Sequence, residues 1–153
     1  MTHILRIFAI SLLVAFTPSL LADEGAVKEK KIITLPAIDM KAKAPKGVNK
    51  KLMSEDAEYG YTDQKPIRVG SKEEYGGPKA ERDYLNSLLD SKGKKIRYKR
   101  LFSGGDDPEG NPLDCYEVTT SDGTKVQLWI SMYHPKNKPE KQPAPVGFYK
   151  LRG

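Results

Sequence analysis

Few side chains in this sequence could do chemistry, and two of them lie near its end. Cys115 is the only cysteine, and His134 is one of two histidines. A nucleophile and its base must lie within hydrogen-bond reach of each other. If residues 113–120 and 125–133 are neighbouring strands, Cys115 pairs with Trp129, and His134 lies about 16 Å further along. We therefore expect no Cys115/His134 dyad and a buried Cys115 that forms no intramolecular disulfide.

An acidic loop is the other candidate for chemistry. Residues 104–114 hold oxygen ligands of the kind that calcium takes: Asp106, Asp107, Glu109, Asn111 and Asp114. Their spacing departs from the calcium-loop pattern, because Pro112 stands where that pattern has glycine. A copper site at Met132-x-His134 would need further ligands of other kinds. The sequence predicts no metal and no cofactor. The alternative to a non-enzymatic protein is a small hydrolase or metal-dependent enzyme that uses this loop with Cys115 or His134.

One stretch, residues 77–133, carries an unbroken series of helix, strand and turn signals. Pro78 suits a first helical turn, and Gly93 suits the position after a helix. An apolar stripe recurs between them at helical spacing: Ala80, Tyr84, Leu85, Leu88 and Leu89. Three strands rich in β-branched and aromatic residues follow, at 95–103, 113–120 and 125–133. The sequence predicts an α+β fold with one main helix packed on a small antiparallel sheet of three to five strands.

The hairpin between the last two predicted strands decides which side chains share a face. With Ser121-Asp122-Gly123 as a three-residue loop, Val118 faces Val126. A two-residue loop would instead mix polar and apolar side chains on both faces. We therefore expect an apolar face toward the helix, made of Tyr116, Val118, Val126, Leu128, Ile130 and Met132, with Ile96, Tyr98 and Phe102 from the first strand.

The opposite face of the predicted sheet carries the candidate ligand-binding residues. Trp129 and Tyr133 lie there beside the basic residues Arg97 and Lys99. Exposed aromatic side chains with charged neighbours are typical of a binding site. We also expect the apolar C-terminal segment, residues 146–151, to fold back over Trp129, because a segment so apolar is preferentially buried.

The first 22 residues have the features of a secretory signal peptide. Arg6 supplies a positive charge, residues 7–16 form an apolar core, and Ala22 ends an acceptable cleavage site. The apolar run is shorter than the roughly 20 residues that span a membrane. We expect cleavage before Asp23, no membrane span in the cleaved chain, and a periplasmic or secreted protein.

Residues 23–60 differ in composition from the rest of the chain. Lysines recur, prolines interrupt, and the only apolar cluster is residues 32–35. A segment with so little to bury does not offset the entropy lost on ordering it. The sequence predicts a basic, mostly disordered tail over 23–60, followed by a small α+β domain over 61–151.

The formal net charge of the whole chain is +6. A basic balance favours anionic partners without naming them. Nucleic acid is not expected for an exported protein, which leaves envelope polymers, lipid head groups and acidic proteins. The expected function is a non-enzymatic binding or interaction module whose ligand is open.

The order of the elements resembles that of PepSY-type domains, small exported bacterial modules of one helix on an antiparallel sheet. The resemblance covers about residues 79–133. It rests on a helix, Gly-Lys-Lys-Ile at 93–96, Cys-Tyr-Glu-Val at 115–118, and Asp-Gly at 122–123 before the last strand. The long acidic loop and the basic tail depart from that pattern. The chain also resembles a small group of uncharacterised bacterial exported proteins. These resemblances imply a binding or inhibitory module and identify no catalytic residue.

Overall fold

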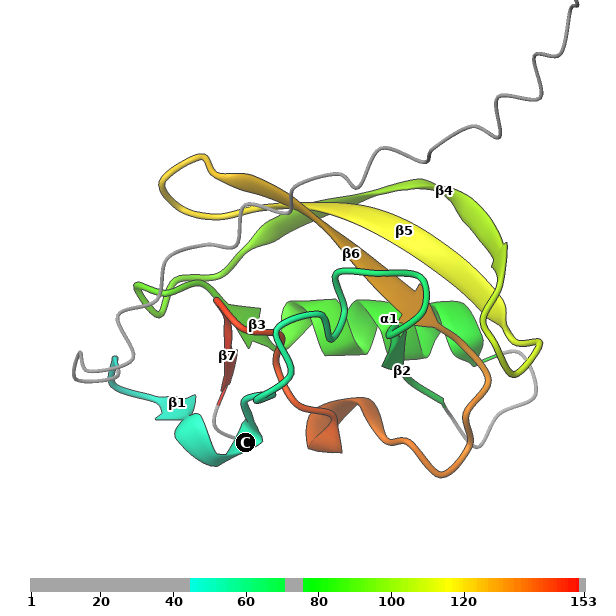
Figure 1. Cartoon of the computed structure of the whole chain (residues 1–153). Coiled ribbons are helices and arrows are strands. Elements are labelled where there is room, and N and C mark those ends of the chain that lie inside the picture. Colours follow the sequence, from blue (N-terminus) through cyan, green and yellow to red (C-terminus); the bar gives the residue numbers. More distant parts are fainter. Residues whose placement is uncertain (1–44, 71–75, 152–153) are drawn as a thin grey trace, which may run out of the picture. The chain divides into compact units, whose positions relative to one another are not determined.

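The computed structural model describes residues 45–70 and 76–151 (Figure 1). Within them the chain forms one α-helix, two short 3-10 helices and two β-sheets, of three and four strands. The predicted α+β class is confirmed. No helix in this part of the chain is long and apolar enough to cross a membrane. The predicted signal peptide and residues 23–44 of the predicted tail lie outside the described residues.

The helix α1 spans Gly77–Asn86 and has the expected proline in its first turn. It ends before the apolar stripe does, where the N–H of Ser87 bonds back to the Tyr84 carbonyl. Two leucines of the stripe instead form β3 (Leu88–Leu89), which pairs with β7 (Tyr149–Leu151). Pairing with a strand distant in sequence has overridden the local helical spacing.

Gly93 does not follow the helix, so its predicted position is wrong. Its φ of 73° closes a separate turn, in which its N–H bonds to the Asp90 carbonyl at 2.9 Å. The Asp90 carboxylate accepts the N–H groups of Lys92 and Lys94, both at 2.9 Å. The left-handed glycine therefore turns the chain between β3 and the next strand.

Four strands form the larger sheet, in the order β2-β6-β5-β4. They are β2 (Ile67–Arg68), β4 (Arg97–Asp106), β5 (Pro112–Thr119) and β6 (Lys125–Ser131). The three long strands are antiparallel, and β2 runs parallel to β6. The predicted hairpin register is confirmed, because Val118 pairs with Val126. Gly123 has a φ of 88°, the left-handed conformation expected at the end of a three-residue loop.

The smaller sheet has the order β1-β7-β3 and begins at β1 (Val48–Asn49). The 3-10 helix η1 (Lys50–Leu52) follows β1, and η2 (Pro139–Lys141) precedes β7. Residues 45–60 thus contain a strand, a 3-10 helix and turns, where the sequence analysis placed part of a tail.

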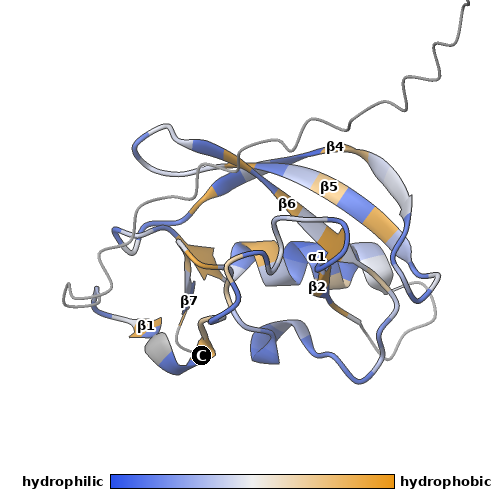
Figure 2. Cartoon of the chain, in the orientation of Figure 1, coloured by the Kyte–Doolittle hydropathy of each residue, from blue (hydrophilic) through white to orange (hydrophobic). Residues whose placement is uncertain are grey.

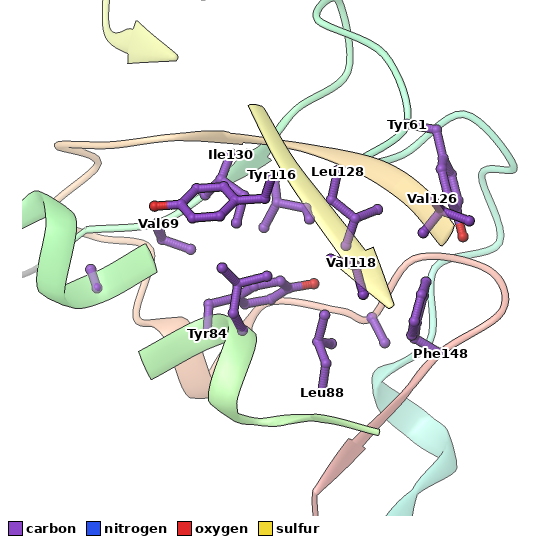
Figure 3. Close-up of a cluster of buried hydrophobic side chains, with 14 residues drawn as sticks. Tyr61, Val69, Tyr84, Leu88, Tyr116, Val118, Val126, Leu128, Ile130 and Phe148 are labelled. Carbon is purple, nitrogen blue, oxygen red and sulfur yellow. The ribbon is translucent and has the colours of Figure 1, made fainter. Parts of the chain in front are cut away.

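Side chains from α1 and from the long strands share one hydrophobic cluster (Figure 3). Figure 2 shows hydrophobic and hydrophilic residues alternating along β5 and β6. The hydrophobic members in these strands are those predicted: Tyr116, Val118, Val126, Leu128 and Ile130. The helix contributes Ala80, Tyr84 and Leu85, while Ile96 and Tyr98 pack at the margin.

The C-terminal segment enters this cluster, so the expectation that it covers Trp129 is wrong. Phe148 is fully buried in the cluster that contains Leu128 (Figure 3). Successive side chains of a strand point to opposite faces, so Trp129 points away from the cluster. The segment is buried as its composition requires, but it is buried in the hydrophobic cluster.

Phe102 also lies on the face opposite to the one expected. The register of β4 shifts between Arg100 and Phe102, so that Arg100 pairs with Tyr116 and Phe102 with Cys115. Such a bulge adds one residue and reverses the alternation of side chains after it. Phe102 consequently leaves the apolar face, and 49% of its surface is exposed.

Candidate functional site

The register of the larger sheet gathers three rows of side chains on the face opposite the hydrophobic cluster. Each row crosses β4, β5 and β6. The rows are Phe102, Cys115 and Trp129; then Lys99, Glu117 and Gln127; then Arg97, Thr119 and Lys125. Neighbouring rows are two residues apart along β5, which is about 7 Å. We call this surface the outer face.

An aromatic pair occupies the first row. The ring centroids of Phe102 and Trp129 are 5.7 Å apart, and their planes meet edge to face at 78°. The Trp129 side chain reaches from β6 to Gly104 of β4, where an added Cβ would lie 2.4 Å from the indole. Cys115, on the strand between, is fully buried as expected. Gly104 therefore lets the partly exposed indole lie across the sheet.

Basic side chains outnumber acidic ones in the other two rows. Lys99 Nζ lies 3.3 Å and Lys125 Nζ 3.2 Å from one carboxylate oxygen of Glu117. Hydrogen bonds from Lys125, and then from Lys99, hold the pKa of Glu117 below its ordinary value. The two lysine side chains remain 64% and 61% exposed, and Arg97 is also exposed. The outer face thus presents a net positive charge to solvent.

The structure brings together three of the predicted binding residues and separates the fourth. Trp129, Arg97 and Lys99 lie on the outer face. Tyr133 lies beyond β6 and has a φ of 64°, in the left-handed region that residues other than glycine rarely adopt. Its ring packs against Gly77 at the start of α1, where an added Cβ would lie 2.9 Å from it. Tyr133 thus lies after the end of β6 and packs against α1, apart from Trp129 on the outer face.

Two exposed residues of the outer face, Lys125 and Phe102, are absent from the predicted set. Lys125 lies four residues before Trp129 on the same strand, so strand alternation alone indicates that they share a face. Phe102 has no such signal, because the bulge in β4 leaves no local mark in the sequence. The structure therefore adds Lys125 and Phe102 to the candidate site.

A second polar cluster forms where the acidic loop meets the end of β6. The Asp107 carboxylate accepts the N–H groups of Glu109 and Asn111, at 2.8 and 2.9 Å, and the Ser131 hydroxyl at 2.8 Å. His134 Nε2 lies 2.8 Å from Ser131 Oγ and 3.3 Å from Asp107 Oδ2. Burial acts to raise the pKa of Asp107, but these hydrogen bonds outweigh it and lower that pKa. The cluster ties the loop to the strand.

The geometry of this cluster does not favour nucleophilic catalysis. Ser131 and Asp107 both contact Nε2 of His134. A catalytic triad instead places the nucleophile and the acid on different ring nitrogens. Ser131 is also fully buried, so its hydroxyl does not face solvent.

The same cluster contains the one set of potential metal ligands found among the described residues. The ligand atoms of Asp107, Glu109 and His134 lie within 4.8 Å of one another. Arg68 of β2 already supplies a cation here, because its guanidinium lies 2.8 Å from the Glu109 carboxylate and 3.6 Å from that of Asp107. The geometry therefore favours an ion-pair network within the protein over a metal centre.

A buried carboxyl network that joins α1 to β5 was not anticipated from the sequence. Glu81 of α1 is fully buried, and Tyr116 of β5 donates to its Oε2 at 2.9 Å. Burial raises the pKa of Glu81 to about 7, and the nearby charge of Asp114 adds to this effect. Arg100 binds the Asp114 carboxylate through two contacts of 2.7 Å. The signal was the position of Glu81 four residues before Leu85, on the apolar stripe.

The resemblance to PepSY-type domains stays a prediction made from element order. Comparison with family models, with curated proteins and with solved structures finds no match to this chain.

Proposed function

We propose that this chain is an exported, non-enzymatic binding module whose outer face takes an anionic ligand of the cell envelope. One observation carries the proposal. On that face a half-exposed Phe102 contacts Trp129, next to rows in which exposed basic side chains outnumber acids. Exposed aromatic surface marks binding sites, and an excess of one charge selects ligands of the opposite charge.

The two faces of the sheet differ in how exposed their side chains are, and this difference supports the proposal. Tyr84 and Leu85 of α1 belong to the cluster on one face, from which we infer that the main helix packs there. The other face keeps Lys99 and Lys125 more than half exposed. A ligand therefore finds room on the outer face.

Approximate energies favour an extended ligand over a small one. Burying the exposed half of Phe102, on the order of 100 Å², contributes about 2.5 kcal/mol. Arg97, Lys99 and Lys125 each add about 1 kcal/mol near an anionic surface, and Glu117 subtracts a similar amount. The total, about 4 to 5 kcal/mol, corresponds to a dissociation constant of about 1 mM. Such a weak contact is useful where the ligand repeats, as in a polymer or a surface.

Export and the absence of catalysis have separate support. The signal-peptide features of residues 1–22 favour a periplasmic or secreted location. The groups of the acidic loop that an enzyme would use, Asp107 and its partners Ser131 and His134, are bonded to one another. We infer that they stabilise the fold and do not turn over a substrate.

Co-sedimentation with isolated cell envelopes tests the proposal. The chain from Asp23 onward should pellet with envelopes, and the variant Lys99→Glu/Lys125→Glu should stay in the supernatant. The matched control Lys141→Glu reverses an exposed charge on η2 and should pellet like the unchanged chain. Equal pelleting of all three proteins would contradict a role for the outer face.

A further inference from the structure

The outer face combines an exposed aromatic ring with long basic side chains, and its ligand can be narrowed further. We propose that this ligand is an anionic lipid surface, which Phe102 enters while Lys99 and Lys125 contact the head-group phosphates. This inference rests on the proposed function, because it names the ligand of the same face.

Both the aromatic pair and the two lysines of the outer face have the chemistry that a lipid interface requires. Phe102 is the half-exposed apolar side chain, and Trp129, in edge-to-face contact with it, has the amphipathic ring that favours the level of the head groups. Lysine side chains extend their charge from an apolar stem, and those of Lys99 and Lys125 are mostly exposed. Lys99 lies one row and Lys125 two rows from the aromatic pair, about 7 and 13 Å along the sheet, so all these side chains can meet one plane.

A protein partner fits this face less well. Stable protein interfaces have a desolvated core that is depleted in charged residues. The outer face instead has the charged group of Lys99, Glu117 and Lys125 at its centre, and Phe102 is its only exposed large apolar side chain. A lipid surface does not require the charges to be desolvated, because they stay among hydrated head groups.

A polymer chain that is bound in a groove also fits less well. The side chains of Phe102, Lys99 and Lys125 are half exposed or more, so they project from the sheet and do not line a groove. A hollow of about 330 Å³ does exist in the described part of the chain. Its lining includes Tyr59, Gln64 and Asn137 and no residue of the outer face.

Glu117 provides the sharpest test, because it opposes the proposed binding. Its carboxylate lies between the two lysines and repels anionic head groups. Glu117→Gln keeps the shape of the side chain and removes the charge. It should strengthen binding to an anionic surface about fivefold, the effect of one unit charge at such a surface.

The experiment uses the chain from Asp23 onward, so that the apolar residues 7–16 make no contribution. Emission of Trp129, the only tryptophan, is followed during titration with vesicles of phosphatidylglycerol and phosphatidylcholine. We expect a blue shift that vesicles of phosphatidylcholine alone do not produce. Phe102→Ser and Lys99→Gln/Lys125→Gln should each weaken partitioning about tenfold or more, and Glu117→Gln should strengthen it. The matched controls Leu151→Ser and Lys141→Gln change equally exposed groups elsewhere and should bind normally.

Titrations with polygalacturonate and polyglutamate separate the two proposals. Binding of either polymer through the outer face, without binding to vesicles, would overturn the lipid inference and leave the proposed function intact. Vesicle binding that ignores Phe102→Ser and Lys99→Gln/Lys125→Gln would also overturn the inference, since another part of the chain would then carry it. If neither vesicles nor polymers nor envelopes bind, both proposals fail.

Discussion

The two faces of the larger sheet are made by the same strands and differ in how they treat apolar and charged groups. On β6, Leu128 and Ile130 are fully buried in the cluster, while Trp129 between them stays partly exposed on the outer face. Charged groups differ in the same way, since Glu81 is buried against Tyr116 of the cluster and Glu117 lies on the outer face between two exposed lysines. One face is therefore committed to the stability of the fold, and the other stays open to solvent.

The largest expected difference between the faces is in the effect of side-chain truncation. Leu128→Ala leaves a cavity in the cluster and should cost about 2 to 5 kcal/mol of unfolding free energy. Lys125→Gln, on the same strand but on the outer face, should cost less than about 1 kcal/mol. Urea unfolding of both variants measures these values, and similar costs would refute the division into two faces.

The second difference is in pH dependence. The folded chain holds the Glu81 proton more tightly than the unfolded chain, because its pKa is raised from 4.5 to about 7. This contribution to stability is complete below pH 4.5 and is lost as pH rises through 7, about 3 kcal/mol in all. Between pH 5 and 7 the unchanged chain should therefore lose stability relative to Glu81→Gln.

Glu117→Gln is the matched control on the outer face. The pKa of Glu117 is lowered, so this carboxylate stays charged over the same range and its removal should leave the pH dependence unchanged. Unfolding measured at a series of pH values compares the three proteins. A flat difference between the unchanged chain and Glu81→Gln would show that Glu81 does not carry the effect.

A smaller effect is expected where the backbone supports the outer face. Gly104→Ala places a Cβ 2.4 Å from the Trp129 indole and must displace it. We expect a loss of about 1 to 3 kcal/mol and a changed emission wavelength of Trp129. Asp106→Ala, an exposed change on the same strand, should alter neither quantity. Unchanged emission in Gly104→Ala would show that Trp129 does not lie against β4.

The smallest expected effect is that of metal ions on the loop cluster. Because Arg68 already pairs with Glu109 and approaches Asp107, Ca²⁺, Zn²⁺, Cu²⁺ and EDTA should leave the melting temperature unchanged. Arg68→Ala removes that cation and is the variant in which a metal-dependent shift could appear. Stabilisation of the unchanged chain by one of these ions would favour the metal-dependent alternative.

The sequence predicted those features that depend on local alternation and turn chemistry. Gly123 and the alternation around Val118 and Val126 are sufficient to define the hairpin register, and from it follows the pairing of Trp129 with Cys115. The sequence therefore predicted the outer-face positions on β5 and β6 and, on β4, those of Arg97 and Lys99 but not that of Phe102.

The features that the sequence did not predict depend on contacts between distant segments. Leu88 and Leu89 continue a helical stripe, but pairing with the C-terminal strand makes them β3. Phe148 was placed on the wrong face because its apolar character requires burial without saying where. The bulge that exposes Phe102 likewise has no local signature, so the aromatic pair became visible only in the structure.

Quenching of Trp129 by iodide and by caesium tests the central claim most directly. An indole on an open, positively charged face should be quenched by both ions, and more by the anion, because the local charge attracts it. Lys99→Gln/Lys125→Gln should remove most of that preference. An emission that neither ion quenches, or that caesium quenches as well as iodide does in the unchanged chain, would contradict an open basic outer face.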